Sequence, residues 1–118
     1  MCWVVAGTPG TGTRAAATAP APGVGYRHVL RGFFGKLSDS TGAVTRNIIV
    51  NSAPSGDYSG MVFVYGLNSA GPSKYANFIF NGLDLMLPAN TALSCQFSGC
   101  GVSETQACTL WGYTIAAP

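Results

Sequence analysis

Short runs of β-branched and aromatic residues, each closed by a cluster of turn-forming residues, dominate the chain from Tyr26 onward. The runs are YRHVLRGFFGKLS, VTRNIIVNS, MVFVYGL, YANFIF, LDLMLP, TALSCQF and QACTLWGYTI. Segments rich in Gly, Pro, Asn, Asp and Ser separate them about every ten residues. Many short strands with turns between them are typical of an all-β sandwich or barrel. With residues 2–5 as a further strand, we expect a jelly-roll-like antiparallel β-sandwich of about eight strands.

The hydrophobic pattern inside the runs favours strands over helices. In TALSCQF, apolar residues alternate with Ser94 and Gln96, which predicts one buried face and one wetter face. Residues 48–50 and 61–65 are apolar throughout, so both faces of these strands are expected to be covered. The opposite sheet covers one face, and a partner subunit is the expected cover for the other.

Residues 7–25 consist mostly of Gly, Ala, Pro and Thr, with no large apolar residue before Val24. Such a tract is typical of an extended linker with polyproline II character. The apolar tip in front of it, Trp3 with Val4 and Val5, is expected to dock on the protein's own sheet or on a neighbouring subunit. The sequence therefore predicts an extended N-terminal arm over residues 1–25 and a β-sandwich domain over residues 26–118.

The glycine-rich part of this tract lacks the residues of a phosphate-binding loop. Such a loop requires Lys and then Ser or Thr after its second conserved glycine, whereas Thr13 and Arg14 follow Gly12. Pro20 and Pro22 also prevent a helix from beginning where a phosphate group would need one. A nucleotide-binding function is therefore not expected.

Charged residues make up only 8% of the chain, and the formal net charge is +2. In an average soluble protein about a quarter of the residues are charged, so we expect much of this surface to be covered by neighbours in an assembly. The basic residues are scattered, which argues against direct contact with nucleic acid. No apolar run approaches the roughly 18 residues of a membrane span, and no signal-peptide pattern is present, so synthesis in the cytoplasm without a membrane partner is expected.

Groups that catalyse reactions are few. The carboxylates Asp39, Asp57, Asp84 and Glu104 lie in or beside expected turns, where such side chains commonly bind the local backbone. The single histidine, His28, lies inside an expected strand, and the sequence brings no thiol to it. We expect a protein that is not an enzyme, with no catalytic residues, no cofactor and no small-molecule substrate.

The four cysteines are Cys2, Cys95, Cys100 and Cys108. They allow three disulfide connectivities, among which the sequence does not choose. Their spacing lacks the C-x-x-C pattern of common zinc sites, so no metal site is expected. Buried free thiols are the preferred interpretation for a chain that folds in the cytosol.

Trp111, Tyr113 and Ile115 fall on one face of the last expected strand, because side chains alternate along a strand. Aromatic rings that stay exposed favour a carbohydrate-binding β-sandwich module, whereas buried rings fill the core. Carbohydrate binding therefore remains an alternative function.

The C-terminal half carries the segment NFIFNGLDLMLPANTALSCQFSG and then the run QACTLWGYTI. The strand pair around LPANTAL, followed by a closing strand with WGYTI, resembles the small jelly-roll virion proteins of tailed bacteriophages, which include capsid decoration or cement proteins and the β domains of head fibres. The resemblance covers about residues 26–115 as a pattern of strands. It implies a structural protein on the capsid surface of a virion that binds the major capsid protein and copies of itself, as a dimer or trimer. A head-fibre, neck or tail component of the same fold is the alternative that it implies.

The expected contact residues belong to the N-terminal arm and to the first strand of the sandwich. They are Trp3, Val4, Val5, Arg14, Tyr26, Arg27 and Phe33. Phe33 and Phe34 point to opposite faces of one strand, so one is expected to fill the core and the other to make a contact. The function expected from these residues is decoration and stabilisation of a bacteriophage capsid.

Overall fold

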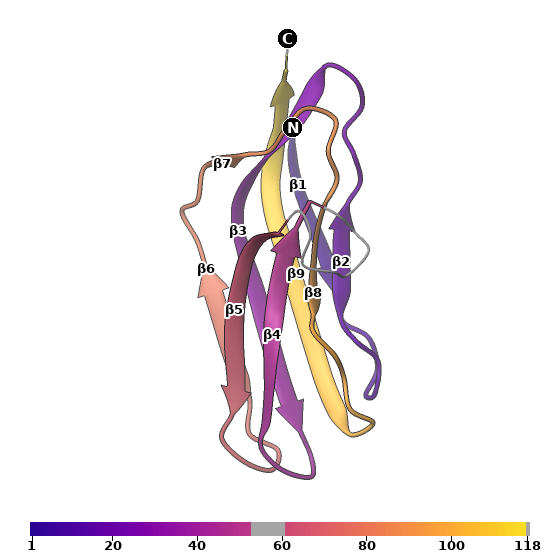
Figure 1. The fold of residues 1–118 in the computed structure, drawn as a ribbon, viewed down its shortest axis with the longest axis vertical. Coiled ribbons are helices and arrows are strands. Elements are labelled where there is room, and N and C mark those ends of the chain that lie inside the picture. Colours follow the sequence, from indigo (N-terminus) through magenta and orange to yellow (C-terminus); the bar gives the residue numbers. More distant parts are fainter. Residues whose placement is uncertain (53–60, 118) are drawn as a thin grey trace.

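Two antiparallel β-sheets stacked face to face form the molecule (Figure 1). The structure, a computed structural model, describes residues 1–52 and 61–117, with only the backbone of Met61 and Val62. The described residues contain no helix. The strands are β1 (Cys2–Gly7), β2 (Ala16–Ala19), β3 (Tyr26–Asp39), β4 (Val44–Asn51), β5 (Met61–Ser69), β6 (Ala76–Phe80), β7 (Leu85–Met86), β8 (Leu93–Phe97) and β9 (Glu104–Ala116).

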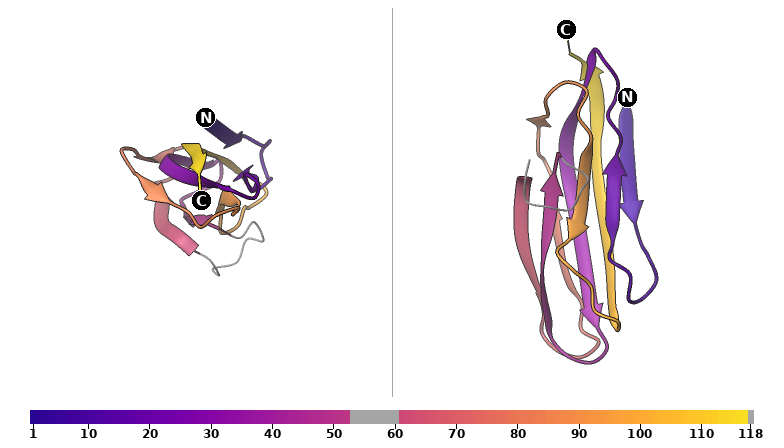
Figure 2. Two further views of the ribbon diagram at one scale, coloured as in Figure 1. Left: turned by 90° about the horizontal axis from the view of Figure 1, so that it is seen from above. Right: turned by 45° about the vertical axis from the view of Figure 1, so that its right-hand side comes forward.

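The order of the strands is that of a jelly roll. Sheet A has the order β1-β9-β3-β6, with β7 also paired to β3, and sheet B has the order β2-β8-β4-β5. Because β6 and β7 pair with successive parts of β3, they are two segments of one interrupted strand. The pairs β1 with β9, β2 with β8, β3 with β6 and β7, and β4 with β5 make one long hairpin that is rolled into two sheets. Figure 2 shows the long strands β3 and β9 running along most of the molecule.

The N-terminal tract lies inside the sandwich and is not a separate arm. β1 pairs with β9 along all six of its residues, and β2 pairs with β8 along all four. The tract was expected to be an extended linker, yet Ala15, Ala17 and Ala19 are buried at every second position. The two sheets approach each other closely here, since a Cβ on Gly7 of β1 would lie 2.1 Å from the carbonyl oxygen of Ala16 in β2. Because of this short distance, the methyl groups of the three alanines are large enough to fill the inner side of the tract. The apolar tip therefore docks on the protein's own sheet.

The core lies between the inner faces of the two sheets. Its largest fully buried side chains are Phe33, Phe97, Leu30, Leu37, Ile48, Ile49, Leu93 and Leu110. Burying a side chain of this size contributes about 1.5–3 kcal/mol. Phe33, one of the expected contact residues, is only 1% exposed, and its ring packs among Phe63, Phe78 and Phe80. Its assignment as a contact residue is wrong, because the core leaves it no surface for a partner.

Most of the expected strands are confirmed, with two differences. LDLMLP forms only the two-residue strand β7, because β3 offers ladder partners there to Leu85 and Met86 alone. In β8 all five residues are buried, including Ser94 and Gln96, so the expected wetter face is wrong. β8 lies between β2 and β4, and the hydroxyl of Ser94 donates to Oδ1 of Asn51 at 2.8 Å on the neighbouring strand. Asp57, one of the expected turn carboxylates, lies outside the described residues.

Candidate interaction surface

The outer side of sheet A carries a continuous group of apolar side chains, here called the sheet A face. Trp3, Val5, Phe33 and Leu110 pack in or against the core, so their neighbours in the alternating strands point outward. A β-bulge between Leu30 and Gly32 lets the inward positions of β3 continue past it. The sheet A face consists of Val4, Val29, Phe34, Ile79, Met86, Trp111, Tyr113 and Ile115.

The register of the strands places these side chains in rows across the sheet. Val4 of β1 is opposite Trp111 of β9, and Phe34 of β3 is opposite Ile79 of β6. A further row runs from Tyr113 of β9 through Val29 of β3 to Met86 of β7. Directly opposite side chains in a sheet are near enough to touch, so the rows form one apolar surface across all strands of sheet A.

The exposed part of this surface lies on its outer strands. Val4, Ile79 and Met86 are 69%, 65% and 60% exposed, respectively. Val29 in the middle of the face is buried, and Trp111 is half-buried beside it. Strands β1, β6 and β7, at the margins, therefore carry the most exposed apolar side chains of the face.

Trp111 is held in place by a glycine of the neighbouring strand. Gly32 is its ladder partner, and a Cβ at Gly32 would lie 2.4 Å from the indole Cζ2 atom. The same Cβ would lie 2.4 Å from the carbonyl oxygen of Phe80. Only a residue without a side chain fits between these groups, so Gly32 lets the indole lie against the backbone of β3.

Three charged side chains on the outer side of sheet A, those of Arg31, Lys36 and Asp84, contact neighbouring side chains. The Tyr113 hydroxyl donates to Oδ1 of Asp84 at 2.9 Å, and Nη1 of Arg31 lies 3.8 Å from the same oxygen. The hydrogen bond to Asp84 raises the pKa of Tyr113 above its usual range. Near the opposite end of β3, Nζ of Lys36 lies 4.2 Å from the centre of the Tyr75 ring. These pairings reduce the free charge on the face.

The expected contact residues are spread over different parts of the molecule. Val4 lies on the sheet A face, and Arg27 points to the same side, opposite Ile115. Trp3 and Val5 pack inward against the core, and the Trp3 ring meets that of His28 edge-on at 5.1 Å. The remaining two, Arg14 and Tyr26, are exposed in the turn before β2 and at the start of β3.

Sequence reasoning missed most of the sheet A face. Ile79 and Met86 were not among the expected contacts, and of the pair Phe33 and Phe34 the wrong member was named, although Phe34, Ile79 and Met86 each alternate with a residue that a strand would bury. Their common signal is the period of two beside a core residue, which identifies an outward apolar position once the inward one is known. The expectation that Trp111, Tyr113 and Ile115 share one face of the last strand is confirmed.

A second feature is a pocket of about 470 Å³ at the edge between β1 and β2. Its lining is mostly apolar: Met1, Trp3, Val5, Ala19, Pro20, Pro22, Tyr26, His28 and Thr114. His28 uses both ring nitrogens in hydrogen bonds, with Nε2 donating to the carbonyl of Pro20 at 2.7 Å and Nδ1 lying 2.9 Å from the hydroxyl of Thr114. Because a carbonyl only accepts, Nε2 carries the proton of its hydrogen bond to Pro20.

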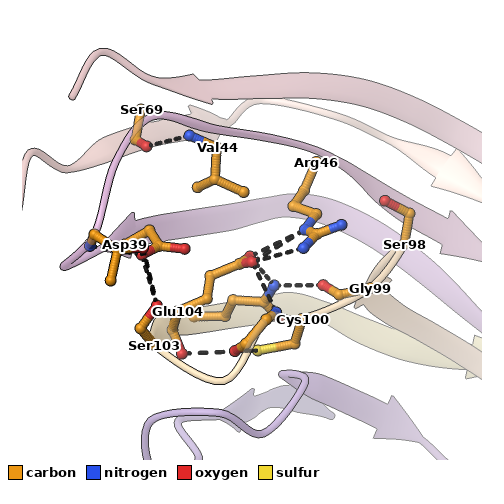
Figure 3. Close-up of polar contacts among 12 residues, drawn as sticks. Asp39, Val44, Arg46, Ser69, Ser98, Gly99, Cys100, Ser103 and Glu104 are labelled. Atoms are coloured by element: carbon orange, nitrogen blue, oxygen red, sulfur yellow. Dashed lines mark hydrogen bonds and ion pairs between the residues drawn. The ribbon is translucent and has the colours of Figure 1, made fainter. Parts of the chain in front are cut away.

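A third feature is the buried carboxylate of Glu104 at the start of β9 (Figure 3). Arg46 of β4 donates to it through Nη2 at 2.9 Å and through Nε at 3.0 Å, and the backbone N–H of Gly101 donates at 3.0 Å. Gln106 donates to the other carboxylate oxygen. Burial would raise the pKa of Glu104, but these donors together lower it below its usual value. The cluster ties the loop between β8 and β9 to sheet B.

Two further properties concern the described residues, 1–52 and 61–117. Among them there is no group of His, Cys, Asp and Glu side chains placed to hold a metal ion. The same residues include no helix that is long and apolar enough to cross a membrane. Comparison of the chain with protein-family models, with curated proteins and with solved structures gives no match.

Proposed function

We propose that the protein is a structural component of a virion that decorates and stabilises a bacteriophage capsid. Its partners are the major capsid protein and further copies of itself. The observation that carries the proposal is the sheet A face, an apolar surface that extends across every strand of one sheet. Contiguous apolar surface on a protein with so little charge favours contact with other protein chains.

The largest contributions are expected from Val4, Ile79 and Met86, the most exposed side chains of this face. Covering one such side chain completely is worth about 1.5–3 kcal/mol, from which the cost of association and side-chain ordering is subtracted. Trp111 supplies a rigid ring between them. Capsid symmetry repeats each contact many times, so a modest affinity per copy strengthens the whole particle.

The copy number per particle tests this role. In purified particles, quantitative mass spectrometry should find the protein in a fixed ratio to the major capsid protein, with many copies in each particle. A head-fibre, neck or tail component of the same fold would be present in only a few copies. If the protein is absent from purified particles, the proposal is wrong.

Variants of single exposed residues test the surface itself. Ile79→Ser removes an apolar side chain from the sheet A face and should weaken co-sedimentation with particles. Val102→Ser is the matched control, because Val102 is also highly exposed but lies in the loop before β9. If both variants bind as the unmodified protein does, the sheet A face is not the contact.

Carbohydrate binding is a second candidate, favoured by the surroundings of Trp111. The indole is fixed against Gly32, and the polar side chains of Arg31 on β3, Tyr113 on β9 and Asp84 just before β7 gather on the same side of the sheet. An aromatic plate with hydrogen-bonding groups nearby suits a sugar ring. Isolated host cell-surface glycans should then quench Trp111 fluorescence in a Trp3→Phe variant, and the absence of quenching would exclude this candidate.

A further inference from the structure

Two buried cysteines face each other between the sheets. Cys95 lies on β8 of sheet B and Cys108 on β9 of sheet A, and both are fully buried in the core. The Sγ atom of Cys108 donates to the carbonyl oxygen of Cys95 at 3.6 Å, and the Cys108 thiol beside it raises the pKa of Cys95. A cysteine side chain is short, so these contacts bring the two backbones nearer than the ~10 Å that usually separates stacked sheets.

Glycines on both sides of Cys108 allow this close approach. Its ladder partners are Gly7 of β1 and Gly35 of β3. A Cβ on Gly7 would lie 2.1 Å from the carbonyl oxygen of Ala16. Ala16 is the first residue of β2, which belongs to the other sheet. A disulfide requires Cα atoms closer together than the normal separation of two sheets, and the glycines provide the needed space at this position.

We infer that Cys95 and Cys108 form a disulfide bond between the two sheets when the chain folds in the presence of a disulfide oxidant. With glutathione disulfide as the oxidant, each cysteine loses one proton and one electron, and a sulfur–sulfur bond forms between them. The two electrons and two protons convert one glutathione disulfide into two molecules of glutathione, by way of a mixed disulfide. Cys2 and Cys100 lack this placement, since Cys2 is exposed on β1 and Cys100 lies in the loop after β8.

The bond is expected to form during folding and not in the folded reduced protein. In the folded protein, the interaction of Cys95 with the Cys108 side chain and the burial of Cys95 both raise its pKa, so Cys95 stays a thiol. Only a thiolate attacks a disulfide. Full burial of both sulfurs also excludes an oxidant of the size of glutathione disulfide. Once formed, the bond is protected from reductants by the same burial.

The experiment uses the full chain with Cys2→Ser and Cys100→Ser, which leaves only the two facing cysteines. After refolding from urea with glutathione disulfide, the protein should be about 2 Da lighter than the reduced form, because two hydrogens leave. It should form no disulfide-linked dimer, show no thiol after unfolding, and have a Tm about 10 °C above that of the reduced form, since the bond closes a short loop. Free thiols, a glutathione adduct or a disulfide-linked dimer would overturn the inference.

Two further measurements identify the bond. Glu104 is the single glutamate in the sequence, so cleavage after glutamate separates Cys95 from Cys108. In the variant with Cys2→Ser and Cys100→Ser, refolded in the same way, the two fragments should stay linked until dithiothreitol is added, and separation without a reductant would contradict the inference. Adding Cys108→Ala to the two serine substitutions gives the matched control, which should lose the rise in Tm. If the rise persists there, the bond is not its cause.

Discussion

Replacing Glu104 by glutamine removes a buried negative charge and keeps the size of the side chain. In the folded protein this carboxylate is fully buried and accepts hydrogen bonds from Arg46, Gly101 and Gln106. Losing one partner of a buried ion pair costs about 3–5 kcal/mol. The Arg46 side chain is 30% exposed, however, so water can partly solvate the guanidinium that loses its partner. We therefore expect Glu104→Gln to lower the free energy of unfolding by about 2–3 kcal/mol at pH 7.

The pH dependence of this loss follows from the lowered pKa of Glu104. A carboxyl group whose pKa is lower in the folded than in the unfolded state stabilises the fold at pH values above its unfolded pKa, which is 4.5 for an ordinary glutamate. That stabilisation disappears as the pH falls below 4.5 and through the pKa of the folded state. The stability difference between the unmodified protein and Glu104→Gln should therefore be constant near neutral pH and shrink in acid.

Urea unfolding followed by circular dichroism between pH 3 and pH 8 measures both effects. Arg46→Gln and the double variant complete a thermodynamic cycle, in which the two losses should be less than additive by more than about 1 kcal/mol. Asp84→Asn is the control, because its exposed pair with Arg31 should contribute less than about 0.5 kcal/mol. A loss below about 0.5 kcal/mol for Glu104→Gln, or a difference that stays constant down to pH 3, would refute this reasoning.

Three further predictions concern the core residue Phe33, the glycine beside Trp111 and the exposed thiol of Cys2. Phe33→Ala should lower the free energy of unfolding by about 3–5 kcal/mol, because Phe33 is fully buried among other rings, and Phe33→Leu should lower it by less. If urea titrations show equally small losses for both variants, Phe33 is not part of the core. Gly32→Ala should cost about 1–3 kcal/mol because its Cβ would overlap the Trp111 ring, whereas Gly66→Ala, with its nearest contact at 3.6 Å, should cost little in the same assay. In the folded reduced protein, Cys2 should react with Ellman's reagent first because it is the exposed cysteine, and Cys2→Ser should remove this fast phase; a fast phase that persists would mean that another thiol is accessible.

The sandwich was predictable because most of its strands are recognisable in the sequence as runs of apolar and β-branched residues. The run that became β3 shows this well, since after its bulge the buried Phe33 and Leu37 flank the less buried Phe34 and Lys36 in alternation with Gly35. β2 was missed because its buried side consists only of two alanines, Ala17 and Ala19. Alanine is small and only weakly hydrophobic, so it does not stand out in a hydrophobic pattern. Whether a small residue is buried depends on how closely the opposite sheet approaches, and this is a property of the tertiary structure.

The candidate surface was predictable only in part. The sequence showed that Trp111 and Tyr113 share a side of β9, but it did not show whether that side faces the core or the solvent. The choice depends on β1 and β6, which pair with β9 and β3 from distant parts of the chain. The position of Ile79 opposite Phe34 is set by this long-range register, so no local pattern reveals it.

Hydroxyl-radical footprinting of the unmodified protein, free and bound to capsid particles, tests most directly whether the sheet A face is the contact surface. Met86 is 60% exposed on that face, whereas Tyr65 is 43% exposed on β5 of the other sheet. Mass spectrometry should show that binding to particles slows the oxidation of Met86 and Trp111 several-fold while the oxidation of Tyr65 continues at its free rate. Equal oxidation of Met86 in the free and bound protein, with Tyr65 protected instead, would contradict the assignment of the sheet A face.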